Sequence, residues 1–94
     1  DIVTELRDYS CEVMVHDPLA ALAEARAEYG IDLFGWQDLK ECSAVILAVP
    51  HRQYLEMEVE TFSAIMAEGA TLVDVKSILD RSELDRAGLD VWRL

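Results

Sequence analysis

The chain has 94 residues, 52% of them hydrophobic and 29% charged, which predicts a single domain over residues 1–94 with one modest core. Its formal net charge of −11 excludes nucleic acid and anionic lipid as expected partners, because their phosphates bind clustered Lys and Arg. No apolar run approaches the roughly 18 residues of a membrane span and no export signal is visible, so we expect a cytoplasmic protein with no membrane partner.

The first half of the chain is predicted to alternate helices with short strands. Apolar spacing and turn residues predict a helix over 1–9, a strand over 12–16, a helix over 19–29, a minor strand over 31–34 and a polar helix over 37–42. Asp17 and Pro18 supply the N-cap and the first residue of the second helix, and Gly30 stops it. Capping therefore explains Asp17 without a ligand.

The second half contains the most apolar strands. The uninterrupted run 44–49 is typical of a central parallel strand covered on both faces, and Pro50 ends it. The elements that follow are predicted as a loop or short helix at 54–55, a helical stripe from Val59 to Met66 that ends before Gly69, a strand over 71–75, a helix over 83–87 with Ser82 in a capping box, and a strand over 90–94.

Strands that alternate with helices at this spacing predict βαβ units with right-handed crossovers. The predicted fold class is therefore α/β, a Rossmann-like parallel sheet with flanking helices. Because a helix at residue 1 has no strand ahead of it, the sheet is expected to lack its first strand, which is central in a Rossmann-like order. We expect the strands at 12–16 and 44–49 either to pair directly or to leave edges through which the chain self-associates.

Charged side chains follow the ends of two predicted strands, which is where open parallel sheets bind their ligands. His51 and Arg52 follow one of these strands, and Lys76 and Arg81 follow the other. Arg52, Lys76 and Arg81 are three of the chain's eight Lys and Arg residues, so positive charge is concentrated at these strand ends. Lys acts as a point charge and Arg as a bidentate donor, so an anion such as a pyrophosphate is the predicted ligand.

The same residues also have structural interpretations. Lys76 could be a solvated lysine paired with Asp74 or Asp80, and His51 could pack in a loop with a hydrogen bond to a backbone carbonyl. His16 lies within a predicted strand and is expected to be a core or edge residue.

Metal and redox chemistry have no support in the sequence. Cys11 and Cys42 form no C-x-x-C pair and are expected to be reduced structural thiols. The two histidines have no recognisable third ligand, so no metal site is predicted.

Three segments together resemble a known family: Ala44-Val-Ile-Leu-Ala-Val-Pro-His51, Asp74-Val-Lys76 and Val91-Trp-Arg-Leu94. They are similar to the C-terminal UDP-binding domain of the UDP-glucose/GDP-mannose dehydrogenase family, and closest in pattern to its UDP-N-acetylhexosamine 6-dehydrogenases. The resemblance implies a domain of an NAD-dependent enzyme that oxidises the C6 alcohol of a UDP-hexose or UDP-N-acetylhexosamine to a uronate for polysaccharide biosynthesis. It also implies that Lys76 contacts the diphosphate or its ribose, with His51, Arg52 and Arg81 in the same substrate site.

Other parts of such an enzyme are missing from the sequence. No G-x-G-x-x-G turn is present, so NAD is expected to be bound by an absent N-terminal domain. Neither cysteine lies in the family's Gly-Gly-x-Cys-type motif, and the family's Phe-Lys segment is missing, so the chain alone is expected to be inactive. Ser43 stands where relatives usually carry aspartate. The expected partners are a UDP-sugar, the remainder of the parent enzyme and further copies in a homo-oligomer.

Two other classes of protein fit a small acidic α/β chain. A phosphoacceptor receiver domain needs an adjacent acidic pair after its first strand, whereas Asp17 is followed by Pro18. A non-catalytic oligomerisation module would bind no ligand and would give Lys76 no role. Loss of Lys76 without an effect on UDP-sugar binding would favour the oligomerisation module.

Overall fold

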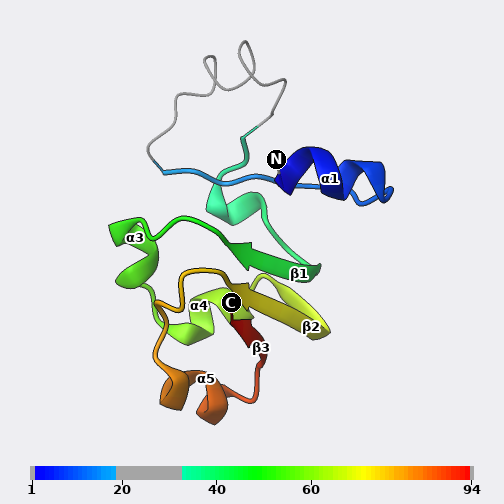
Figure 1. Cartoon of the computed structure of the whole chain (residues 1–94). Helices are drawn as coiled ribbons and strands as arrows, with labels where there is room; N and C mark the ends of the chain where they lie inside the picture. Colours follow the sequence, from blue (N-terminus) through cyan, green and yellow to red (C-terminus); the bar gives the residue numbers. More distant parts are fainter. Residues whose placement is uncertain (1, 19–32, 94) are drawn as a thin grey trace. The chain divides into compact units, whose positions relative to one another are not determined.

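The computed structural model of the chain describes residues 2–18 and 33–93 (Figure 1). The chain divides into two compact units, 1–38 and 39–94. The helix predicted over 19–29 lies outside the described residues. All of the predicted substrate-binding residues belong to the second unit.

The first unit begins with α1 (Ile2–Asp8), which confirms the helix predicted over 1–9. The chain leaves this helix at Ser10, whose φ of 65° lies in the left-handed region. The amide of Ser10 donates to the carbonyl of Arg7 at 2.9 Å, which satisfies one of the carbonyls that a helix end leaves without a partner.

The strand predicted over 12–16 is wrong in extent, because within the described residues it contributes a single bridge. Val15 pairs in parallel with Leu33, and the amide of Phe34 donates to the Val15 carbonyl at 2.8 Å. The ladder cannot continue because its partner turns at once into the 3-10 helix η1 (Trp36–Asp38).

The 3-10 helix η1 also provides the ring against which His16 packs. The rings of His16 and Trp36 meet edge to face, with centroids 5.3 Å apart, which fits a packing role for this histidine. The polar helix predicted over 37–42 is wrong beyond its first residues, because η1 ends at Asp38 and Cys42 already opens the first strand of the sheet.

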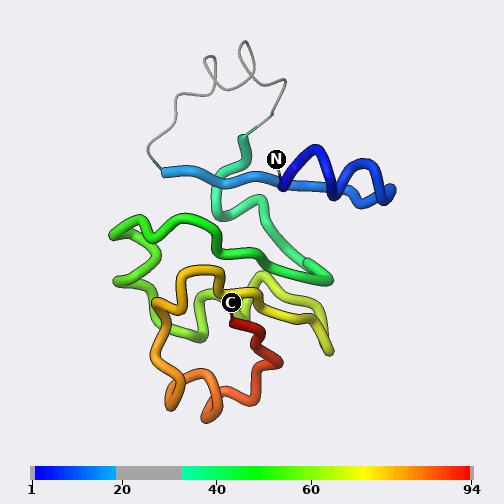
Figure 2. The backbone as a smooth tube through the Cα atoms, in the orientation of Figure 1, coloured from blue at the N-terminus to red at the C-terminus, as the bar shows by residue number. Residues whose placement is uncertain are grey.

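The second unit is built on a three-stranded sheet in the order β1-β2-β3, with both pairs parallel (Figure 1). Its strands are β1 (Cys42–Leu47), β2 (Met66–Asp74) and β3 (Asp90–Arg93). The chain passes from β1 to β2 through α3 (Arg52–Leu55) and α4 (Val59–Ser63), and from β2 to β3 through α5 (Arg81–Ala87), as the backbone trace shows (Figure 2). This arrangement confirms the predicted α/β class with a parallel sheet and flanking helices.

The core of the second unit is formed by one face of the sheet with α4 and α5. Leu72 of β2 and Leu84 of α5 are fully buried and form a cluster with Val59 of α4. Val45 and Val91 flank Leu72 in the register of the sheet and pack against the same cluster. Burial of each large apolar side chain contributes about 2 kcal/mol to folding.

The central strand of the sheet is β2, whereas the sequence predicted the run 44–49 for that position. Among the described strands β1 forms an edge, and Ala44 in it is exposed. Ile46 of β1 and Trp92 of β3 lie in one register row on the face opposite the core, and they are 37% and 63% exposed. An apolar run therefore indicated a parallel strand here but did not indicate burial on both faces.

β2 begins earlier than predicted, at Met66 instead of residue 71, because α4 ends at Ser63. The register between β1 and β2 shifts between the pairs Cys42–Met66 and Ala44–Thr71, so the first part of β2 is irregular. Gly69 lies in this irregular part with a φ of 79°. A glycine at positive φ thus bends the strand where the sequence suggested the end of a helix.

The helix α5 (Arg81–Ala87) begins two residues earlier than predicted and is capped by Asp80, not by Ser82. An Asp80 carboxylate oxygen accepts from the Glu83 amide at 3.1 Å, which is the contact of an N-cap side chain with the third helical residue. Gly88 ends the helix with a φ of 72°. The predicted capping box was shifted by two positions because Asp80, which is also a good N-cap residue, competes with Ser82.

Candidate functional site

The segments that follow β1 and β2 leave the sheet side by side at its carboxyl edge. Leu47 pairs with Asp74 at the end of the ladder, and the Val75 amide continues it by donating to the Leu47 carbonyl at 3.1 Å. In Figure 1, α3 and the segment after β2 both lie beyond the arrowheads of these strands. The structure thus brings together the two segments that were predicted to form the site.

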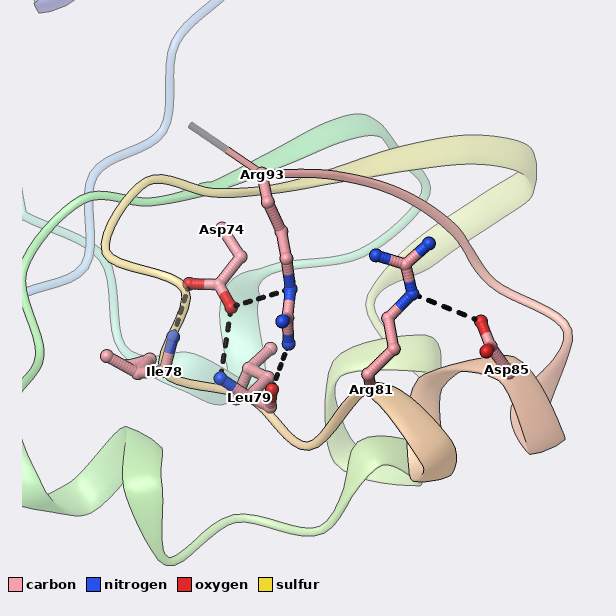
Figure 3. A network of polar contacts seen from close by, with 6 residues as sticks. All are labelled: Asp74, Ile78, Leu79, Arg81, Asp85 and Arg93. Atoms are coloured by element: carbon pink, nitrogen blue, oxygen red, sulfur yellow. Dashed lines mark hydrogen bonds and ion pairs between the residues drawn. The ribbon is translucent and has the colours of Figure 1, made fainter.

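Asp74 occupies the last position of β2 and is completely buried. One carboxylate oxygen accepts from the Ile78 amide at 3.1 Å, and the other accepts from the Leu79 amide at 3.0 Å (Figure 3). The carboxylate therefore folds the segment 75–79 back over the end of its own strand. Its role is structural, because both oxygens are bound to the backbone of the loop.

Arg93 reaches Asp74 from the neighbouring strand, since the two residues are register partners in β2 and β3. Its Nε lies 3.8 Å from Asp74 Oδ2, which is an ion-pair distance but too long for a hydrogen bond. This buried Nε has no hydrogen-bond partner in the described part of the chain. Nη2 of the same guanidinium donates to the Leu79 carbonyl (Figure 3).

The Asp74–Arg93 pair was not among the contacts predicted from the sequence. A signal was present, because Asp74 and Arg93 both end strands that were predicted to be parallel. Deciding that they meet required the register between β2 and β3, which sequence spacing does not provide.

Lys76 lies in the turn directly after β2 and is exposed. Within residues 2–18 and 33–93, no ion pair joins it to Asp74 or Asp80, the partners that its structural interpretation required. Asp74 is bound to the loop and Arg93, and Asp80 caps α5. The ammonium group is therefore presented at the carboxyl edge of the sheet.

His51 and Arg52 stand at the start of α3, which confirms the short helix predicted near 54–55. The His51 ring meets the buried Tyr54 ring edge to face at 5.7 Å. Arg52 is exposed and pairs with Glu56 along the helix at 4.0 Å. Ring packing thus holds His51 in part, while Arg52 makes a long surface contact with Glu56.

Arg81 begins α5 and pairs with Asp85 at 3.6 Å, pointing away from the Asp74–Arg93 contact (Figure 3). Both residues of this pair are more than half exposed. Such surface pairs are typically worth less than about 1 kcal/mol, so the guanidinium can turn toward a stronger anion at little cost.

Cys42 does not belong to this edge of the sheet. Cys42 is the first residue of β1 and so lies at the opposite, amino edge, where its thiol contacts the Lys40 carbonyl at 3.8 Å. Burial raises the pKa of the Cys42 thiol, which disfavours the nucleophilic thiolate. Cys11 is in the first unit, and both thiols are free. Cys42, the one cysteine of the second unit's described residues, therefore lies at the other end of β1 from the carboxyl edge.

The strand-to-helix turns of this sheet lack the glycines that are typical of a dinucleotide-binding domain. These turns, 48–51 and 75–80, contain no glycine, whereas a pyrophosphate of NAD needs a glycine-rich turn to approach the backbone. Gly69 and Gly88 lie inside β2 and at the end of α5.

The described residues contain no group of three or more His, Cys, Asp or Glu side chains placed to hold a metal ion. None of the helices in these ranges has the length and apolar character needed to cross a membrane.

The chain matches the UDP binding domain of the UDP-glucose/GDP-mannose dehydrogenase family over residues 1–81. It is 33% identical over 93 residues to protein CapL of Staphylococcus aureus, a match that covers 99% of this chain and 22% of that protein. It is 34% identical over 85 residues to the UDP-N-acetyl-D-glucosamine 6-dehydrogenases of Salmonella typhi and Pseudomonas aeruginosa, which covers 90% of this chain and 20% of each relative. No solved structure matches the chain significantly.

The family match includes β1, β2 and the loop with Lys76, the parts that form the carboxyl edge described above. The chain spans about a fifth of the length of the curated relatives that it matches. It belongs to the UDP-glucose/GDP-mannose dehydrogenase family and corresponds to the UDP-binding domain of that family.

Proposed function

We propose that this chain is the UDP-recognition domain of an NAD-dependent nucleotide-sugar 6-dehydrogenase. The parent enzyme oxidises the C6 alcohol of a UDP-hexose or UDP-N-acetylhexosamine to a uronate for polysaccharide biosynthesis. The similarity to two UDP-N-acetyl-D-glucosamine 6-dehydrogenases supports this reaction class. The domain itself binds the nucleotide and has no activity alone.

The observation that carries the proposal is the position of Lys76. A chain with 19 acidic and 8 basic residues repels an anion over most of its surface. At the carboxyl edge, however, Lys76 is exposed, and the neighbouring carboxylate of Asp74 is buried and bound to its own loop. This edge is where open parallel sheets bind nucleotides.

Each basic residue has a distinct proposed role. Lys76 acts as a point charge on the diphosphate, since an ammonium group has no preferred plane. Arg52 and Arg81 exchange their surface carboxylates for phosphate oxygens, to which a guanidinium binds in bidentate fashion. His51 donates to a phosphate or to a ribose hydroxyl from the start of α3.

We assign NAD and the catalytic cysteine to the remainder of the parent enzyme. The glycine-free turns of this sheet and the distance of Cys42 from the carboxyl edge, at the other end of β1, support that division. The proposed partners are a UDP-sugar, the rest of the enzyme and other copies in a cytoplasmic homo-oligomer.

The test is a titration of the 94-residue chain with UDP, followed by chemical shifts that register millimolar affinity, for the wild type and Lys76→Ala. Loss of a charge-assisted contact is worth roughly 2 kcal/mol, so we expect the dissociation constant to rise by a factor of about ten or more.

Lys40→Ala is the matched control, because Lys40 is the only other lysine, is also exposed and lies next to the amino edge of β1. It removes the same charge from the chain and should leave UDP binding nearly unchanged. Equal binding by the wild type and Lys76→Ala would contradict the proposal and favour a structural or oligomerisation module.

A further inference from the structure

We propose that Arg93 and Asp74 form a positioning pair that holds Lys76 in place to bind the diphosphate, without either residue touching the nucleotide. The proposal rests on the function proposed above and adds two residues to its site. Arg93 belongs to a third strand, beyond the two strands whose ends carry the predicted site. Its contribution would therefore come through the loop and not through direct contact.

Hydrogen bonds from backbone amides hold the loop on both sides of Lys76. On one side, the Val75 amide donates to the Leu47 carbonyl of β1 at 3.1 Å. On the other side, the amides of Ile78 and Leu79 donate to the buried carboxylate of Asp74. Only Lys76 and Ser77 lie between these two anchored points, so the backbone position of Lys76 is set by hydrogen bonds that the nucleotide does not need to make.

The turn between the anchors is tight. Ser77 has a φ of 54°, in the left-handed region that residues other than glycine rarely adopt, and its amide donates to the Asp74 carbonyl at 3.2 Å. Such a conformation persists only where the surrounding contacts impose it. The contacts of Asp74 are the ones that close this turn.

Arg93 stabilises the buried carboxylate of Asp74, to which the loop is bound. A fully buried carboxylate needs hydrogen bonds and an opposite charge, and Arg93 supplies that charge at 3.8 Å. The same guanidinium donates to the Leu79 carbonyl, so it holds the loop and the carboxylate together (Figure 3). Its side chain is only 24% exposed, which leaves it engaged with the loop and not with solvent.

A lysine on a turn held by hydrogen bonds loses less conformational entropy when it binds a ligand than a lysine on a mobile loop. Removal of Arg93 should therefore weaken UDP binding through Lys76. It should have no further effect once Lys76 is absent.

The experiment is a double-mutant cycle with UDP and the full 94-residue chain, comparing the wild type, Lys76→Ala, Arg93→Met and the double variant. We expect Arg93→Met to raise the dissociation constant about fivefold, and the double variant to bind within about twofold of Lys76→Ala alone. A purely structural or independent role would instead multiply the two effects in the double variant.

Two further variants keep the result interpretable. Arg86→Met removes an exposed guanidinium from α5 and should bind UDP like the wild type. Arg93→Lys keeps the positive charge but cannot reach both Asp74 and the Leu79 carbonyl, so we expect it to recover part of the affinity. If Arg93→Met fails to give a folded spectrum, Arg93→Lys replaces it in the double-mutant cycle. The dissociation constant for UDP is then expected to rise by about twofold to threefold.

The outcomes separate this inference from the proposed function. Binding that depends on Lys76 but is unchanged by Arg93→Met, or by Arg93→Lys if only that variant folds, would overturn the positioning role alone. Multiplied effects in the double variant would also overturn it. An absence of Lys76-dependent binding in the wild-type chain would overturn the proposed function, and the positioning role with it.

Discussion

Two charged residues at the end of β2, Asp74 and Lys76, are separated by one position and occupy opposite environments. Asp74 is completely buried and binds two amides and a guanidinium, while Lys76 is exposed in the turn. The period of a strand explains Asp74, since it shares the core face with Leu72 two positions earlier. Lys76 comes after the strand has ended and is free of that constraint.

A prediction at the residue scale concerns the start of α5. Asp80→Ala should lower the free energy of unfolding by about 1 kcal/mol, because it removes the side chain that accepts from the Glu83 amide. Ser82→Ala, at the position that the sequence suggested for the cap, should change it by less than about 0.5 kcal/mol. Urea denaturation of the two variants distinguishes these assignments, and a larger loss for Ser82→Ala would contradict the structure.

At the scale of elements, β2 organises the second unit. It pairs with both other strands, supplies Leu72 to the core and ends in the Asp74 anchor. Its first part is irregular, with Gly69 at positive φ, and its last part runs in unbroken register with β1 and β3. The regular part of the strand leads directly to the candidate site.

The irregular part of β2 gives a second stability prediction. Gly69→Ala should destabilise the fold by about 1 kcal/mol, although a side chain at this position would meet no atom within 4 Å. The expected loss comes from backbone conformation, so Gly69→Asn should lose less, because asparagine tolerates positive φ better than alanine. Thermal unfolding of the two variants measures the difference, and an unchanged midpoint for Gly69→Ala would show that the strand adopts another conformation there.

Much of the second unit could be predicted from local sequence. The apolar runs near 44–49, 71–75 and 90–94 indicated all three parallel strands, and the charged residues after them indicated the segments at the carboxyl edge. The order of the strands and the Asp74–Arg93 contact could not be predicted, because both depend on pairing between distant segments. The early start of β2 was missed because Val59 to Met66 also fits a helical period.

At the scale of the whole molecule, β1 and β3 are the outer strands of the sheet that residues 33–93 form. The β3 edge carries Asp90 and Arg93, whereas no charged residue or proline occurs in β1. Charges and prolines are the usual protection of an edge strand against pairing with another chain. The sequence suggested either direct pairing of 12–16 with β1 or self-association through the edges that remain, and inside the first unit Val15 pairs with Leu33. Self-association through β1 thus stays a prediction.

Ala44→Lys tests that prediction, because it places a charge on the exposed part of the β1 edge. We expect the wild-type chain to sediment as dimers or larger species at high concentration, and Ala44→Lys to shift it toward monomer. Ser82→Lys adds the same charge on α5 and serves as the control. A wild-type chain that stays monomeric at millimolar concentration would contradict self-association through this edge.

A UDP site at the carboxyl edge can be tested by a map of the amide chemical shifts that UDP changes in the 94-residue chain. We expect the largest changes in 48–52 and 75–79, the segments that leave β1 and β2 at the carboxyl edge, and we expect these changes to vanish in Lys76→Ala. Changes concentrated in the first unit or around α4 and α5, or changes that persist without Lys76, would contradict a UDP site at this edge.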